Sequence, residues 1–310
     1  MTFSVTVLGS SSALPTSSRY PTAHLLNAYE RFFLIDCGEG TQIQLRKVKA
    51  KFSKINQVFI SHLHGDHYFG LFGLLSSLSL LGRTKGLHIY AHKELEEILS
   101  FHFKYHQLEF EIIFHELPKE TPSVIYEDKQ ITVTTFALSH QTPSNGFLFK
   151  EKIKERNIKK EAIQFYKLSI KDIVKVKNGE DFITSTGEVI PNSKLTFPPF
   201  KQRAYAFCSD TAFEPLIIPV IKGVDILYHE STFAEDMRQR AKETFHSTAK
   251  DAAIIAKQAE VKRLLLGHFS ARYKDLSIFE SEAGEIFKDV ENVIEGNTYN
   301  IELEREEETI

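Results

Sequence analysis

Cysteine is scarce in this chain of 310 residues, which has only Cys37 and Cys208. Both lie in apolar, strand-like stretches, so we interpret them as small buried thiols in a reducing cytosol and not as a disulfide. A scaffold held together by disulfides is thereby excluded. The opening residues Met1 to Ser4 begin a strand and lack the basic and then apolar pattern of a signal peptide, so we expect a cytoplasmic protein.

Long apolar runs and a large net charge are also lacking. Leu71 to Leu81 is interrupted by glycine and serine and is much shorter than the ~20 residues that a membrane span needs. The formal net charge is −3, so the chain as a whole has no positive field that would attract nucleic acid. We therefore expect no membrane partner, and a polyanionic partner would have to be held by a local basic patch.

The composition is that of an ordinary globular protein, with 42% apolar and 25% charged residues. Two domains are possible at this length, but α/β folds of this size often form one large core. We predict an α/β fold with a single domain over residues 1–310. Residues 150–202 differ in character and are predicted to be an arm inserted into that domain.

The most informative stretch is VFISHLHGDH, residues 58–67. An apolar run that favours a β-strand leads into His62, His64, Asp66 and His67, and the end of a strand is a common place for chemistry in an α/β sheet. His62 and His64 are two residues apart and can project to one side of an extended backbone. Asp66 and His67 follow on what is expected to be the first turn of a helix, which we predict over residues 68–81. A histidine-rich surface loop is the alternative, but this density of nitrogen and oxygen donors favours a metal site that suits zinc.

Other predicted strands also lead into polar residues. Because successive strands can end at one edge of a sheet, we expect these side chains to lie close together. The possible metal donors are His62, His64, Asp66, His67, His140, Asp210 and His268. They are too many for one tetrahedral zinc, but they suit two metals if Asp210 bridges them.

Two metals can hold a hydroxide between them and stabilise an in-line displacement at phosphorus. The leaving oxygen then needs a proton from an acid that is not a metal ligand. His246 is the unassigned candidate for this acid, and Glu230, which follows another predicted strand, could orient it.

One stretch is strongly basic. Lys152 to Lys177 contains nine lysine or arginine residues and three acidic ones, with Phe165 and Tyr166 among them. It is either a solvated helix and hairpin without a partner or a grip for a phosphate backbone. The small-residue loop Gly9 to Thr16 is likewise either an ordinary turn or a cradle of backbone N–H groups for an anion.

Six short motifs complete the sequence evidence. They are LGSSSALPT (8–16), DCGEGTQ (36–42), SHLHGDH (61–67), HESTF (229–233), HSTA (246–249) and GHFSARY (267–273). With His140 and Asp210, they resemble the metallo-β-lactamase superfamily and, within it, the ribonuclease Z family of tRNA 3′-endonucleases. The likeness covers nearly the whole chain.

The resemblance implies an αββα four-layer sandwich, two zinc ions per subunit and a homodimer. It also implies cleavage of precursor tRNA after the discriminator, which leaves a 3′-hydroxyl on the tRNA. Asp66 is implied to be the proton acceptor beside its role as a ligand. The implied ligands are His62, His64 and His140 for one zinc, Asp66, His67 and His268 for the other, and Asp210 for both.

The arm departs from the family pattern, because Ala162 to Val176 lacks the glycine and proline of the usual turn. Two other functions compete with the endonuclease. One is a metal-dependent phosphodiesterase or arylsulfatase that acts on small substrates with the same fold. The other is a catalytically idle RNA-binding protein, which a missing metal ligand would support, but none is missing.

Overall fold

The structure is a computed structural model that describes residues 1–307, apart from the side chain of Phe52. The chain divides into two compact units. The first unit consists of Met1–Lys150 and Ala204–Ile301, and the second consists of Glu151–Arg203 and the residues from Glu302 onward. The second unit begins and ends within one residue of the arm expected at residues 150–202, and it includes the C-terminal segment as well.

Seven strands form the first sheet of the first unit, in the order β20-β1-β3-β4-β5-β6-β7. β4 to β7 run parallel to one another, so their carboxyl ends lie at one edge of the sheet. The strands are β1 (Phe3–Gly9), β3 (Ala23–Ala28), β4 (Arg31–Ile35), β5 (Ile55–Phe59), β6 (Leu87–Ala91), β7 (Ile112–Glu116) and β20 (Thr298–Asn300).

The second sheet of this unit also has seven strands, in the order β19-β17-β16-β15-β10-β9-β8. β15, β16, β17 and β19 are parallel. A separate short parallel pair joins β2 (Ser11–Ser12) to β18 (Phe269–Ser270). The strands of the large sheet are β8 (Ser123–Glu127), β9 (Ile131–Leu138), β10 (Ser144–Glu151), β15 (Ala204–Cys208), β16 (Ile226–Glu230), β17 (Arg263–Gly267) and β19 (Val290–Asn292).

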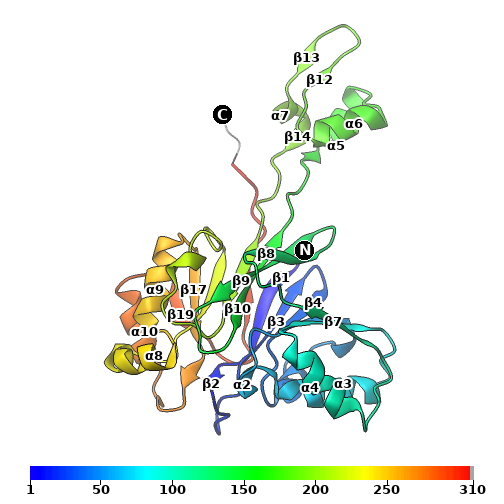
Figure 1. Ribbon diagram of the computed structural model, residues 1–310. Helices are drawn as coiled ribbons and strands as arrows, with labels where there is room; N and C mark the ends of the chain where they lie inside the picture. The colour runs from blue at the N-terminus through cyan, green and yellow to red at the C-terminus, as the bar shows by residue number, and fades with distance from the viewer. Residues whose placement is uncertain (308–310) are drawn as a thin grey trace. The chain divides into compact units, whose positions relative to one another are not determined.

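Helices cover the outer faces of both sheets. Figure 1 shows α3 and α4 beside the first sheet and α8, α9 and α10 beside the second, so the layers are helix, sheet, sheet and helix. This confirms the predicted four-layer sandwich. The helices are α1 (Thr41–Lys47), α2 (Gly65–Tyr68), α3 (Gly70–Leu80), α4 (Glu94–Phe103), α8 (Arg238–Thr244), α9 (Ala249–Gln258) and α10 (Ser277–Gly284). Within residues 1–307, no helix is both long and apolar enough to cross a bilayer.

Alternating side chains give the first sheet two apolar faces. On β4, Phe33 and Ile35 enter the core between the sheets, whereas Leu34 enters the core under α3 and α4. The ring centroids of Phe33 and Phe59 lie 5.6 and 5.4 Å from that of Phe149 in the second sheet. Truncating a buried phenylalanine of this kind to alanine costs ~3–5 kcal/mol. Aromatic packing therefore fixes the two sheets face to face.

The helix expected over residues 68–81 is interrupted, because α2 ends at Tyr68 and α3 begins at Gly70. The amide of Cys37 donates to the carbonyl of His67 at 2.7 Å, and the amide of Gly70 donates to the carbonyl of Cys37 at 2.9 Å. These bonds use backbone groups that a continuous helix would pair internally. A Cβ at Gly70 would lie 2.0 Å from the carbonyl oxygen of Gly38, so the approach requires glycine. The turn after β4 thereby holds the short helix that carries Asp66 and His67.

The second unit has its own small core, formed by Ala162, Val176, Ile190 and Leu195. Ser169 begins α6 in a capping box with Asp172. The strands of the second unit pair as β11 with β14 and as β12 with β13. The elements are β11 (Asn157–Ile158), α5 (Lys160–Phe165), α6 (Ile170–Lys177), β12 (Phe182–Ile183), β13 (Val189–Ile190), α7 (Asn192–Leu195) and β14 (Thr196–Phe197).

The cations of this unit fall into two kinds. Lys154 and Lys177 form ion pairs at 2.7 Å with Glu151 and Glu155, and Lys159 donates to a backbone carbonyl at 3.0 Å. The lysines with exposed side chains are Lys160, Lys167, Lys171, Lys175 and Lys194. Only part of the basic stretch therefore lies fully at the surface.

Candidate functional site

The predicted metal donors come together in the first unit, where strands of both sheets end. β5 is followed by His62 and His64, α2 carries Asp66 and His67, β9 is followed by His140, β15 by Asp210 and β17 by His268. The parallel register of β15, β16 and β17 places the ends of β15 and β17 on either side of the end of β16. Residues that are more than 200 positions apart in the chain thus surround one point.

The seven side chains form two groups that share Asp210. In the first group, Nε2 of His62 and Nε2 of His140 lie 3.6 and 4.0 Å from Oδ2 of Asp210. Nδ1 of His64 lies 3.3 Å from Nε2 of His140. Three imidazole nitrogens and one carboxylate oxygen therefore converge here.

The second group faces the other oxygen of the same carboxylate. Nε2 of His67 and Nε2 of His268 lie 3.3 and 3.2 Å from Oδ1 of Asp210. Oδ2 of Asp66 lies 3.4 and 3.3 Å from the same two nitrogens. One carboxylate thus presents one oxygen to each group, which is the geometry of a bridging ligand.

Three atoms of this cluster are buried without a hydrogen-bond partner among residues 1–307, namely Nε2 of His62, Nε2 of His67 and Oδ1 of Asp210. An unpaired buried polar group costs ~1–3 kcal/mol. Three of them facing one another indicate that a cation is their partner. Imidazole nitrogens and carboxylate oxygens are zinc ligands, so the residues fit a metal-dependent site.

The charge state of the carboxylates suits the same role. Burial alone would raise the pKa of Asp210, but His268, His67 and His62 hold that pKa well below its usual value. Burial also opposes ionisation of Asp66, and His67 and His268 outweigh it and lower the pKa of this carboxyl. Both groups are therefore anionic at neutral pH, as metal ligands must be.

Asp36 fixes the orientation of the histidine loop. Its Oδ2 lies 2.7 Å from Nδ1 of His67 and accepts the Ser61 hydroxyl at 2.9 Å, while its Oδ1 accepts the Ser61 amide at 2.7 Å. Asp36 is buried and has a left-handed backbone with φ of 54° directly after β4. Sequence reasoning did not assign it to the site, although its position between a strand and a glycine turn was a usable signal.

Two other imidazoles of the cluster are also held at Nδ1. Nδ1 of His268 lies 2.9 Å from the hydroxyl of Thr232, and Nδ1 of His140 lies 2.8 Å from the carbonyl oxygen of Phe245. Such bonds set the tautomer and leave Nε2 facing the cluster. Thr232 is a second residue that the sequence did not single out by itself.

His246 and Glu230 form a separate pair beside this cluster. Nδ1 of His246 lies 2.9 Å from Oε1 of Glu230 and 4.0 Å from Oδ2 of Asp210. Burial opposes protonation of His246, but the Glu230 carboxylate outweighs it and raises the pKa of His246 to about 9. His246 therefore carries a proton at neutral pH and can donate it.

Glu230 could itself be a metal ligand, because it forms a third possible group with His246 and His268. Its oxygens, however, already accept hydrogen bonds from the amides of Thr211, Ser247 and Thr232 at 3.2, 3.0 and 2.8 Å and from the Thr232 hydroxyl at 2.9 Å. We therefore interpret Glu230 as the group that orients His246. Glu230 does not follow its strand, as predicted, but is the last residue of β16, since His229 and Glu230 stay in register with Leu266 and Gly267.

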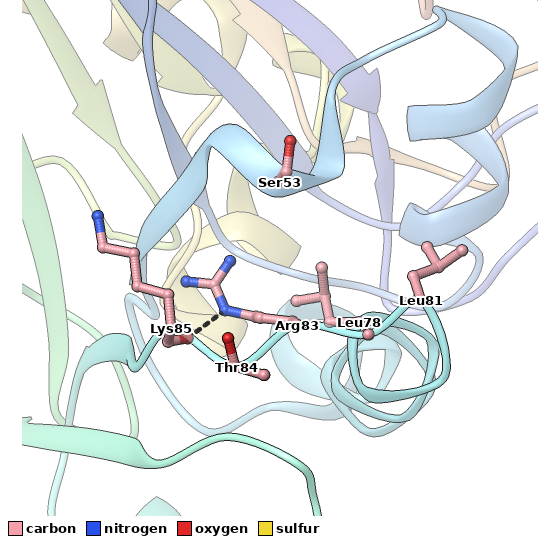
Figure 2. A pocket seen from close by; sticks show the side chains of 7 residues that line it. Ser53, Leu78, Leu81, Arg83, Thr84 and Lys85 are labelled. Atoms are coloured by element: carbon pink, nitrogen blue, oxygen red, sulfur yellow. Dashed lines mark hydrogen bonds between the residues drawn. The ribbon is translucent and has the colours of Figure 1, made fainter.

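A pocket elsewhere in the first unit has different properties. Figure 2 shows its lining, which includes Ser53, Leu78, Leu81, Arg83 and Lys85. The Arg83 guanidinium donates to the carbonyls of Lys85, Ile55 and Gly86 at 2.7, 2.9 and 2.9 Å. The guanidinium of Arg83 is therefore bound to the protein's own backbone. None of the predicted site residues lines this pocket.

Comparison with known proteins identifies the family of this chain. Residues 3–159 match the family model described as Anti-Pycsar protein Apyc1. A curated relative from Bacteroides fragilis, named Ribonuclease Z, is 50% identical over 287 residues, which cover 92% of this chain and 94% of the relative. The crystal structure of human tRNase Z, short form, is 27% identical with a TM-score of 0.69 and covers 96% of this chain and 98% of its own.

The fold has a further match in the metallo-β-lactamase fold protein YhfI from Bacillus subtilis. This structure has a TM-score of 0.69 at 18% identity and covers 96% of this chain and 98% of its own. The fold class predicted from the sequence is thus confirmed. The chain belongs to the ribonuclease Z family.

Proposed function

We propose that this protein is a zinc-dependent endoribonuclease that removes the 3′ trailer of precursor tRNA and leaves a 3′-hydroxyl on the tRNA. As a member of its family it is a phosphodiester-cleaving hydrolase. The observation that carries the zinc assignment is the Asp210 carboxylate, whose two oxygens face two separate donor groups. A single metal would not need that arrangement.

In the proposed centre, Asp210 would contribute to both zinc sites. His62, His64 and His140 would hold one ion, and Asp66, His67 and His268 would hold the other. When bound, two such ions acidify a water molecule and stabilise negative charge on the phosphoryl oxygens. The three unpartnered buried atoms at the cluster support this assignment.

The protein's own groups move the protons. Asp66 accepts a proton from the attacking water as the new oxygen–phosphorus bond forms. His246 donates its proton to the departing 3′ oxygen of the tRNA as the old bond breaks. Glu230 keeps His246 protonated and orients its imidazole ring, because Oε1 of Glu230 lies 2.9 Å from Nδ1 of His246.

The arm at residues 150–202 is proposed to be an insertion in one domain and to hold the tRNA away from the metal centre. Its exposed lysines suit phosphate contacts that do not read base sequence. The resemblance to the family further supports a cytoplasmic homodimer. Sedimentation of the purified protein tests the dimer, and a monomer at micromolar concentration would contradict it.

The first experiment measures zinc per chain and turnover together, for the wild type and Asp210→Ala. The wild type is expected to hold two zinc ions and to cleave precursor tRNA far better than a small chromogenic phosphodiester. Asp210→Ala is expected to lose zinc and both activities. Full activity with one tightly bound ion would contradict the two-metal centre, and better turnover of the small diester would favour the small-substrate hydrolase.

A further inference from the structure

Glu295 is a half-buried carboxylate near the end of the first unit that no step of the proposed reaction uses. Its Oε1 accepts three hydrogen bonds, from the amide of Ser10, the hydroxyl of Ser10 and the amide of Tyr20, at 3.0, 3.0 and 2.8 Å. Its Oε2 accepts one from Nε2 of Gln44 at 3.2 Å. Ser10 and Tyr20 are the two ends of one surface loop, so a single oxygen fastens both ends.

The Ser10–Tyr20 loop is closed on itself. The amides of Ser10 and Ser11 both donate to the carbonyl of Tyr20 at 2.9 Å. A Cβ at Gly9 would lie 1.7 Å from the carbonyl oxygen of Pro21, so the two stems of the loop are in close contact. The position of the loop tip therefore depends on how these stems are held.

The tip of this loop contacts the metal cluster directly. Ala13 has a left-handed backbone with φ of 60°, and its amide donates to Oδ2 of Asp66 at 2.7 Å. The same oxygen lies 3.3 Å from Nε2 of His268. One side of the Asp66 carboxylate is thus set by a backbone group of the loop.

The loop also contacts the segment that carries His268. The amide of Phe269 donates to the carbonyl of Ser10 at 2.8 Å, and Ser11 pairs with Phe269 in the short β2–β18 ladder. Nη2 of Arg19 donates to the carbonyls of Ser270 and Tyr273 at 3.2 and 3.1 Å. A shift of the loop would therefore disturb the second donor group at two points.

We propose that Glu295 is a positioning residue, which holds the Ser10–Tyr20 loop so that the Ala13 amide orients the Asp66 carboxylate for proton transfer. This inference rests on the proposed function, because Asp66 is the proton acceptor there. A misplacement of ~1 Å at a reacting group can lower a rate by ~10²-fold. Loss of the clamp is therefore expected to lower kcat and to leave KM nearly unchanged, since the loop tip acts on the carboxylate and not on the bulk of the substrate.

The test compares Glu295→Ala, Glu295→Gln and a matched control, Asp289→Ala, with the wild type. Asp289 lies in the same C-terminal segment, and its carboxylate is 3.8 Å from Arg263. We measure kcat and KM on precursor tRNA and on a small chromogenic phosphodiester, with zinc content and Tm for every variant. Glu295→Ala is expected to lose ~10–100-fold in kcat on both substrates with its zinc retained. Glu295→Gln keeps one carbonyl oxygen that can accept the bonds of Ser10 and Tyr20, and it is expected to recover most of the loss.

Three results would overturn the inference. The first is wild-type kcat in Glu295→Ala, and the second is a loss confined to KM on tRNA, which would make the loop an RNA contact. The third is a loss of zinc or a large fall in Tm in both Glu295 variants, which would make the residue structural. Failure of the wild type to cleave precursor tRNA would contradict the proposed function instead, and the small diester would still report on Glu295.

Discussion

At the level of single residues, a variant of His246 tests protonation of the leaving group separately from metal binding. His246→Ala is expected to keep its zinc and to lose cleavage of precursor tRNA by ~10²–10⁴-fold, the usual range for general acid catalysis. A phosphodiester with a better leaving group needs the proton less and should be partly spared. Rates on both substrates together with zinc analysis check this, and an equal loss on both would assign His246 a structural role.

The pH dependence of the reaction follows from the pair of Glu230 and His246. The pKa of His246 is raised to about 9, so the acid is present below that pH, and kcat/KM should fall as the pH rises through it. In Glu230→Gln the carboxylate that favours the imidazolium is gone while burial still opposes it. The alkaline limb should therefore move to lower pH. A pH–rate profile of the two proteins measures this, and an unmoved limb would show that another group titrates.

Asp36 gives a prediction about metal affinity. Asp36→Asn replaces the carboxylate that lies beside Nδ1 of His67 and accepts hydrogen bonds from the amide and the hydroxyl of Ser61. Loss of such a supporting carboxylate commonly weakens metal binding or activity by 10–100-fold, that is by ~1.4–2.7 kcal/mol. Competition with a zinc chelator measures the affinity. Asp275→Asn, an exposed carboxylate next to α10, is the control and should match the wild type.

The residues of the site differ in how readily a sequence indicates them. The seven donors could be predicted, because each type of side chain is a known ligand and most of them follow an apolar run. Glu295 could not, since a carboxylate that accepts backbone and hydroxyl hydrogen bonds is indistinguishable in sequence from one at the surface, and the only signal for Asp36 was its position between a strand and a glycine turn. Their roles depend on loops that pack across long distances in the chain, such as Ser10 against Glu295.

At the scale of elements, the arm offers the clearest test. The exposed Lys171 and Lys175 lie on α6, and alanine at both should weaken binding of precursor tRNA and flatten its salt dependence. Hydrolysis of a small diester should be unchanged, because all seven donors lie in the other unit. Lys257→Ala with Lys288→Ala, two exposed lysines of the first unit, is the matched control. An unchanged salt slope in the arm variant would make the stretch a solvated appendage or a subunit contact.

Element boundaries show where sequence reasoning reached its limit. β9 and β15 lead into His140 and Asp210, in agreement with the strands predicted before these donors. The predicted helix over 68–81 was wrong at its start, because the carbonyl of His67 is used by the amide of Cys37. That bond comes from a turn some thirty residues earlier, and local propensity contains no information about it.

In the molecule as a whole, a metal centre built at the strand ends is proposed to cleave precursor tRNA. The measurement that tests it most directly maps the cut on a precursor tRNA labelled at either end, with the zinc-loaded enzyme, the chelated enzyme and the enzyme reloaded with zinc. We predict one cut after the discriminator, a 3′-hydroxyl on the tRNA, loss of the cut on chelation and its return with zinc. Cleavage at scattered positions, a 3′-phosphate on the tRNA, or full cleavage after complete removal of metal would contradict a metal-dependent tRNA 3′-endonuclease.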